Sequence, residues 1–189
     1  MLYDNSQAPN APSDDVVNRF YTRFPSSQAV QRYNKGQDDI YSIASETVAM
    51  GSHYRLQGAR NAKSLIYVDH VVIKYLQMLV ARYGLERFSP KLDENAYSAY
   101  NSAHRLTFLA AFEQAARAHA FADLSPDLDY LANIKFTVKI YDHFVHHYLF
   151  SIFERERLQP GSTAKAFAQQ SVYQNRHRVG ILLHLLSHC

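Results

Sequence analysis

The feature that most constrains the fold is a long helical pattern over residues 126–158. Apolar residues recur at positions 134, 138, 141, 145, 148 and 152, which is the spacing of one helix face. A second apolar row, at 136, 140, 144 and 149, extends this face around most of the helix. Because a helix that is apolar nearly all round is buried, we expect this segment to lie at the centre of a helical bundle.

Both ends of this segment carry helix signals. Ser125 can cap the first turn, Pro126 suits the first helical position, and Asp127 favours the positive end of the helix. Pro160 and Gly161 end the pattern after residue 158.

The remaining chain is predicted to be helical as well. Pro25 and Gly84 mark two helix ends, and His104 lies on the apolar face of an alanine-rich segment that Asp93 can cap. No segment has the two-residue alternation of a strand followed by a hairpin turn. The predicted helices cover residues 14–24, 27–34, 62–83, 93–120, 126–158 and 162–187, and a helical pattern broken by glycines covers residues 40–60. The predicted fold class is therefore all-α, a single-domain helical bundle of about six helices with the 126–158 helix central.

Composition agrees with one folded domain. Hydrophobic residues make up 47% of the 189 residues, whereas glycine and proline number only six each, which suits long helices better than a turn-rich β-fold. Residues 1–12 are polar and predicted to be a flexible leader, and residues 13–189 are predicted to form the helical domain. The chain stops inside the apolar pattern of residues 181–189, which predicts either a truncated longer protein or an end that packs on a partner.

Charge and cysteine content limit the expected binding partners and cellular location. Lysine and arginine number 20 against 17 acids, and this net charge of +3 is too small to imply nucleic acid or an anionic membrane by itself. The single cysteine, Cys189, excludes an internal disulfide. No signal peptide and no run of 18 apolar residues is evident. We expect a soluble intracellular protein.

Ten histidines include two pairs at helical spacing, which indicate a candidate metal site. His143 and His147 are four residues apart, as are His184 and His188, so each pair shares a helix face. Imidazoles that meet across a bundle can bind a transition metal such as zinc. The alternative is that these rings are ordinary buried or surface side chains, with no cofactor.

A second pattern lies on the last predicted helix, where Arg178 precedes His184 by six positions. This spacing resembles the Arg-x(4–6)-His pattern of the HEPN ribonucleases, which are also small helical bundles. The resemblance implies that Arg178 and His184 would act on the scissile phosphate of RNA. It covers seven residues, and Val179 stands where that family usually has a polar residue.

A basic and aromatic stretch follows in the first third of the chain. Arg55, Arg60 and Lys63 could bind phosphate, and Tyr54 could stack on a base. Further basic residues, Arg19, Arg23, Arg32 and Lys35, would extend this surface. The alternative is a solvated helix face joined to a glycine-broken connection.

Two functions therefore remain as hypotheses. The first is a non-enzymatic helical protein-interaction module, with a protein partner or self-association through the apolar C-terminal helix and a basic N-terminal surface that contacts nucleic acid. The second is a helical-bundle enzyme with a His-centred site, either a metal-dependent hydrolase or a HEPN-like ribonuclease.

Overall fold

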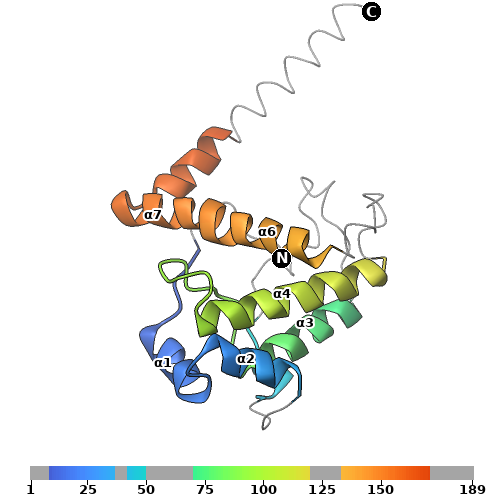
Figure 1. Ribbon diagram of the computed structural model, residues 1–189. Coiled ribbons are helices and arrows are strands. Elements are labelled where there is room, and N and C mark those ends of the chain that lie inside the picture. Colours follow the sequence, from blue (N-terminus) through green and yellow to red (C-terminus); the bar gives the residue numbers. More distant parts are fainter. Residues whose placement is uncertain (1–8, 37–41, 50–69, 120–132, 171–189) are drawn as a thin grey trace, which may run out of the picture.

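The computed structural model describes residues 9–36, 42–49, 70–119 and 133–170. These ranges contain the helices α1 (Asp14–Arg23), α2 (Ser27–Asn34), α3 (His70–Arg82), α4 (Ala99–Arg117), α6 (Ile134–His143) and α7 (Phe150–Leu158), the 3₁₀ turn η1 (Ser45–Thr47) and the π-helical segment η4 (Phe144–Leu149) (Figure 1). A further helix begins at residue 162 and continues to 170. The described residues form no β-strand beyond one isolated bridge. The predicted all-α fold class is thus confirmed.

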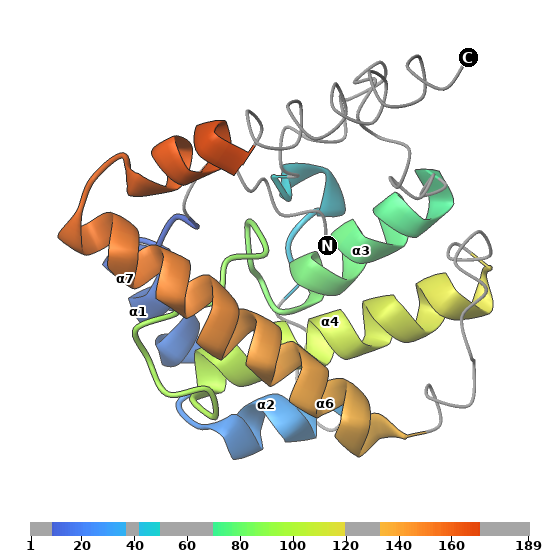
Figure 2. The ribbon, with the colours of Figure 1, turned by 90° about the horizontal axis from the view of Figure 1, so that it is seen from above.

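Helix α4 occupies the centre of the described bundle. It contacts α1, α2 and α3 on one side and α6 on the other. The continuous rod α6–η4–α7 crosses over α4 as an outer layer (Figures 1 and 2). The prediction that the 126–158 helix is central is therefore corrected, because α4 takes that position and the described part of the predicted helix lies at one side of it.

The first and larger core lies between α4 and the first three helices. Phe20 of α1 is fully buried and packs edge-on against Tyr100 of α4, with ring centroids 5.2 Å apart. Tyr33 and Tyr83 are also buried, and the Tyr33 hydroxyl donates to the carbonyl of Arg82 at 2.7 Å. Their rings add apolar area while their hydroxyls find partners at the edge of the core.

Two helix ends in this half follow the sequence signals, and the start of α4 does not. Ser26, at the N-cap of α2, accepts the N–H of Ala29 at 3.2 Å. Gly84 follows α3 with a φ of +66°, a left-handed conformation that glycine adopts without steric cost. Helix α4 begins later than predicted, because Ser98 and not Asp93 occupies its N-cap and accepts the N–H of Asn101.

The loop between α3 and α4 is fastened by Asn101, a fully buried residue of α4. Its side-chain oxygen accepts the N–H of Lys91 at 2.9 Å. Its amide nitrogen donates to the carbonyls of Lys91 at 2.9 Å and Asn95 at 3.0 Å. Backbone groups of the loop that would otherwise be unpaired are therefore paired by one side chain.

Residues 42–49 correct another prediction, which extended a helix through this region. The described part contains only the 3₁₀ turn η1 and an isolated bridge between Ala49 and Arg87. The N–H of Ile43 donates to the carbonyl of Ala81 at 3.1 Å, and that of Ala49 to the carbonyl of Glu86 at 2.7 Å. Pairing with the end of α3 and the following loop thus replaces the helical hydrogen bonds.

The first turn of the helix that follows α7 and begins at residue 162 is capped by a carboxylate. Glu156 accepts hydrogen bonds from the N–H groups of Gly161 at 2.6 Å and Thr163 at 2.9 Å, and from the Ser162 hydroxyl at 3.1 Å. These bonds, first of all the one from Thr163, lower the pKa of Glu156 to about 2. The capping acceptor of this helix therefore comes from Glu156 in α7.

One residue of the predicted leader is hydrogen-bonded to the loop between α3 and α4. The carbonyl of Asn10, within the predicted leader, accepts the Ser89 hydroxyl at 3.1 Å. Among the described helices, none combines the length and apolar character that crossing a bilayer requires.

Candidate functional site

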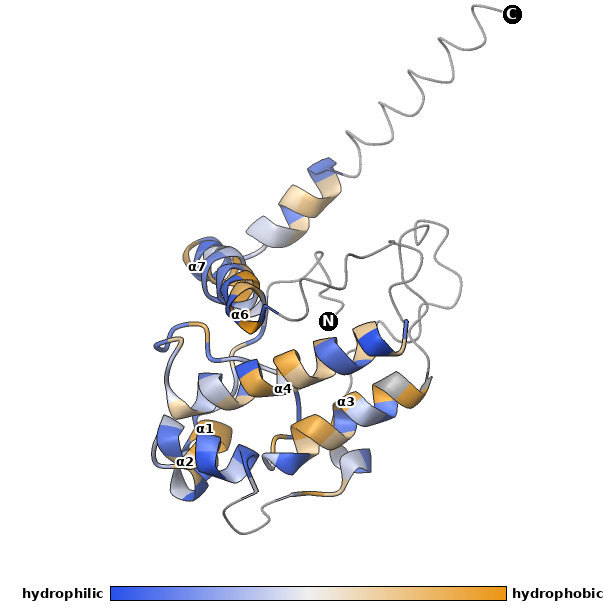
Figure 3. Ribbon diagram, turned by 45° about the vertical axis from the view of Figure 1, so that its right-hand side comes forward, coloured by the Kyte–Doolittle hydropathy of each residue, from blue (hydrophilic) through white to orange (hydrophobic). Residues whose placement is uncertain are grey.

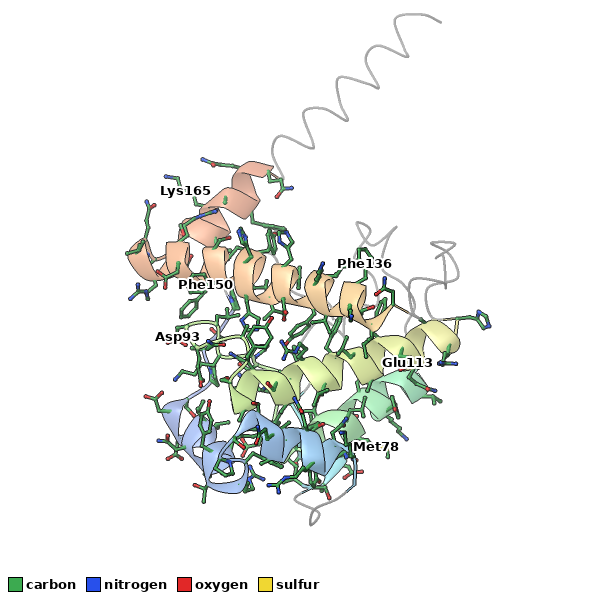
Figure 4. The ribbon with its side chains drawn as sticks, viewed as in Figure 1. Met78, Asp93, Glu113, Phe136, Phe150 and Lys165 are labelled. Carbon is green, nitrogen blue, oxygen red and sulfur yellow. The ribbon has the colours of Figure 1, made fainter. Side chains whose placement is uncertain are left out.

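The α6–η4 segment is the candidate site, because its two faces differ chemically. Asn133 caps its start by accepting the N–H of Phe136 at 3.1 Å. Side chains at four-residue spacing face α4 and the loop before it and are buried, and those one position earlier in each turn are exposed. Figure 4 places Phe136 on the side of α6 away from α4 and Phe150 on the side facing the loop that carries Asp93. We call the buried side that faces α4 and its preceding loop the inner face, and the exposed side the outer face.

The inner face forms the second core. Tyr141 and Val145 are 1% exposed and Leu149 is 8% exposed. They pack with Leu92 of the α3–α4 loop and with Phe108 of α4, whose ring centroid lies 5.0 Å from that of Tyr141. This apolar contact holds the outer layer onto α4.

Several polar atoms are nevertheless buried at this contact. His104 of α4 is fully buried between the rings of Phe88 and Tyr100, at centroid distances of 5.1 Å and 4.5 Å. Its Nδ1 lies 2.9 Å from the carbonyl oxygen of Tyr100. Since a carbonyl only accepts, Nδ1 must carry the proton, and in the neutral ring Nε2 is then an acceptor.

This Nε2 atom forms no hydrogen bond of normal geometry, although the backbone of Arg87 lies near the ring and favours its protonated form. Three other buried polar atoms also lack a hydrogen-bond partner. They are Thr107 Oγ1, Tyr141 Oη and His146 Nε2. Buried polar atoms are nearly always paired, so four such atoms between two helices are unusual. One of them, His146 Nε2, belongs to the π-helical segment η4, a type of turn that occurs frequently at functional sites.

Burial governs the protonation of these groups. It lowers the pKa of His104 to about 4 and also lowers the pKa of His146. A positive charge on the His146 imidazole further opposes protonation of His104. It raises the pKa of the Tyr141 phenol. Charged imidazolium is therefore disfavoured at the inner face around neutral pH.

One ion pair joins the two helices beside these groups. Arg105 of α4 lies 3.3 Å from the carboxylate of Asp142 of α6, and their side chains are 14% and 24% exposed. The guanidinium carbon of Arg105 also lies 4.8 Å from the ring centroid of Tyr97. The pair fixes the position of α6 along α4 at the border of the second core.

The outer face carries large apolar side chains at four-residue spacing. Ile140 is 49% exposed, Phe144 37% and Tyr148 44%. The rings of Phe144 and Tyr148 stack at 5.6 Å with an angle of 22° between their planes. We call Ile140, Phe144 and Tyr148 the apolar row. Figure 3 shows both hydrophobic and hydrophilic residues on this rod.

A second exposed row runs beside the apolar row. It consists of Lys135, Lys139, His143 and His147, one position earlier in each turn, and we call it the basic row. The one carboxylate within α6 and η4 is that of Asp142, which is paired with Arg105. The outer face of α6–η4 thus combines apolar groups with cationic or ionisable nitrogen groups.

Most of the predicted site residues lie outside the described residues. This applies to the HEPN-like pair Arg178 and His184 and to the second predicted metal pair, His184 and His188. It also applies to the predicted phosphate-binding residues Arg55, Arg60, Lys63 and Tyr54. Of the four predicted metal ligands, His143 and His147 are described and lie together on the outer face. The described residues contain no group of three or more metal-ligating side chains. The four-histidine centre stays a prediction.

Helix α1 shows what two of the predicted basic residues contact. A cavity of about 330 Å³ lies between α1 and the residues after α3, and Arg19 and Arg23 line it. Arg19 forms an ion pair with Glu86 at 3.4 Å, and Arg23 donates to the carbonyl of Gly84 at 3.1 Å. Both guanidinium groups are thus engaged by this chain. Arg32 and Lys35, like Arg19, are exposed.

Sequence reasoning missed the polar inner face. It placed His104 on an apolar face without assigning a role, and it did not connect His146 with Asp142 four residues before it. A histidine in the middle of a buried alanine-rich face was the available signal. Comparison of the chain with protein-family models, with curated proteins and with solved structures finds no match.

Proposed function

We propose that the protein is a helical interaction module that binds an acidic amphipathic helix of a partner protein on the outer face of α6–η4. The observation that supports this is the apolar row, three large side chains between 37% and 49% exposed on a helix whose opposite face is buried. Exposed apolar groups gathered on one face mark interaction sites more often than scattered ones. Regular four-residue spacing suits a helix laid alongside.

The charge of the outer face selects the chemistry of the partner. The basic row offers two lysines and two histidines beside the apolar row, and the only carboxylate of α6 and η4 is already paired. A partner helix with glutamate or aspartate beside its leucine-type residues would match both rows. Such complementarity raises the association rate and disfavours basic partners.

The apolar row is expected to contribute most of the binding free energy of the partner helix. Full burial of a large apolar side chain contributes roughly 1.5–3 kcal/mol. Aromatic residues near the middle of an interface are enriched among those that contribute most to binding. Phe144 stands in the middle of the row, with Ile140 and Tyr148 one turn away on either side.

A designed peptide pair tests this proposal. One labelled peptide carries leucines at positions i, i+3, i+4 and i+7 with flanking glutamates, and the other has lysines in place of the glutamates. We expect the acidic peptide to bind the full-length protein at least about tenfold more tightly than the basic one, measured by fluorescence anisotropy at two salt concentrations. Binding of the acidic peptide is expected to weaken as salt rises.

The substitution Ile140→Ser/Phe144→Ser is expected to weaken acidic-peptide binding at least about tenfold, which is about 1.4 kcal/mol. Met78→Ser is the matched control, because Met78 is 59% exposed but lies on α3. Equal binding of both peptides, or an equal loss in the Met78 variant, contradicts the proposal. Binding to anionic vesicles or dimerisation through the row, without peptide binding, also contradicts it.

A further inference from the structure

Two histidines of the basic row are placed to share a metal ion. His143 is the last residue of α6, and His147 lies four residues further on, in η4. Their ring centroids are 5.2 Å apart and their planes differ by 26°. Both side chains are exposed, and within the described part of the chain their stacking on each other is the contact that orients them.

We propose that His143 and His147 form a two-imidazole site for a divalent transition-metal ion of the zinc, nickel and copper class. An imidazole nitrogen binds such an ion at about 2.0–2.1 Å, so two nitrogens on one ion lie at most about 4.2 Å apart. Rings with centroids 5.2 Å apart reach this separation by side-chain rotation. That rotation is fast for exposed residues.

The site leaves coordination positions open. Because the described residues contain no group of three metal-ligating side chains, water or a ligand from another source must complete the shell. Imidazole ligands favour copper, nickel and zinc over magnesium and calcium, which prefer oxygen. Copper(II) should therefore bind most tightly, and magnesium should not compete.

Lys139 provides a separate electrostatic signature. It lies one helical turn before His143 on the same exposed row, so its positive charge opposes the binding of a cation. Replacing it with glutamine is expected to tighten metal binding by about twofold at low salt. Metal binding by histidines elsewhere in the chain would not change when Lys139 is replaced.

Calorimetric titration of the untagged full-length protein with Ni²⁺, Zn²⁺ or Cu²⁺ tests the site. Compared with the wild type, His143→Gln/His147→Gln is expected to lose one bound metal equivalent. Metal binding to two residues of the folded helix stabilises the folded state and raises the urea midpoint. The double variant should lose this part of the metal-induced rise. His119→Gln is the matched control, since His119 is an exposed histidine just after α4.

Equal stoichiometry and affinity in the wild type and the double variant would overturn the metal site, as would saturation by Mg²⁺ at the same concentration as by Zn²⁺. Metal binding and peptide docking are separable. The Ile140→Ser/Phe144→Ser variant keeps both imidazoles and is expected to bind metal as the wild type does.

Discussion

Replacing Asn101 with leucine is expected to lower the free energy of unfolding by about 3 kcal/mol, a value in the range for a broken buried hydrogen-bond network. Leucine has the same number of side-chain heavy atoms and the same branching but larger end groups, so a cavity is not the cause. The loss arises because the N–H and carbonyl of Lys91 and the carbonyl of Asn95 lose the partner that now pairs them. Each buried polar group left unpaired costs about 1–3 kcal/mol, less whatever water recovers.

Urea unfolding of the variant measures this loss. Asn18→Leu is the matched control, because Asn18 is an exposed residue of α1 and its substitution should change stability by no more than about 0.5 kcal/mol. Asn101→Asp should also destabilise, since a carboxylate can still accept from Lys91 but cannot donate to the carbonyls. A leucine variant as stable as the Asn18 control would show that the loop does not depend on this side chain.

Acidification from pH 7 to pH 4 is expected to lower the free energy of unfolding by about 3 kcal/mol through His104 alone. The folded-state pKa of this residue is about 4, whereas an unfolded histidine titrates near about 6.5. Between these values the unfolded chain binds the proton and the folded protein does not. Stability is therefore fully present above about pH 6.5 and falls by about 1.4 kcal/mol per pH unit down to pH 4.

The structure supplies the cause of this acid sensitivity. His104 is fully buried between Phe88 and Tyr100, and the imidazole of His146 on the facing helix opposes a second positive charge. Urea unfolding of wild type and His104→Leu at several pH values, without divalent metal, isolates the contribution. The wild-type curve should fall more steeply between pH 6.5 and pH 4. Parallel curves for the two proteins would refute the assignment.

The sequence signals located helix ends better than helix faces. Pro25 and Gly84 act through local backbone conformation, so the ends of α1 and α3 could be predicted from them. Helix α4 could be predicted as a helix, but its N-cap could not, because Asp93 and Ser98 are both suitable capping residues. The choice between them depends on the loop that Asn101 fastens.

The burial of the 126–158 pattern was mispredicted for a physical reason. Four residues of an α-helix advance 40° beyond a full turn, so a row at four-residue spacing drifts around the helix. The π-helical turn of η4 takes up an additional residue, which offsets this drift and keeps Tyr141, Val145 and Leu149 on one line. Tyr148 was predicted to be in the buried row and is exposed. Apolar content alone does not distinguish a core face from a face left for a partner.

The candidate site was only partly accessible to sequence reasoning. The i, i+4 spacing brought His143 and His147 together correctly, because helix geometry alone sets that distance. The inner polar groups could not be found this way. Their contact depends on which face of α4 meets which face of η4, and that is a property of tertiary packing.

Thiol labelling along α6–η4 tests most directly whether this rod has one buried and one accessible face. In a Cys189→Ser background, Ile140→Cys and Phe144→Cys should react with a maleimide within about tenfold of the rate of an unstructured thiol, whereas Val145→Cys should react at least about 100-fold more slowly, in line with the 49%, 37% and 1% exposure of the native side chains. Protection of positions 140 and 144 equal to that of position 145, in dilute protein, would contradict the two-faced rod and the docking surface proposed on it.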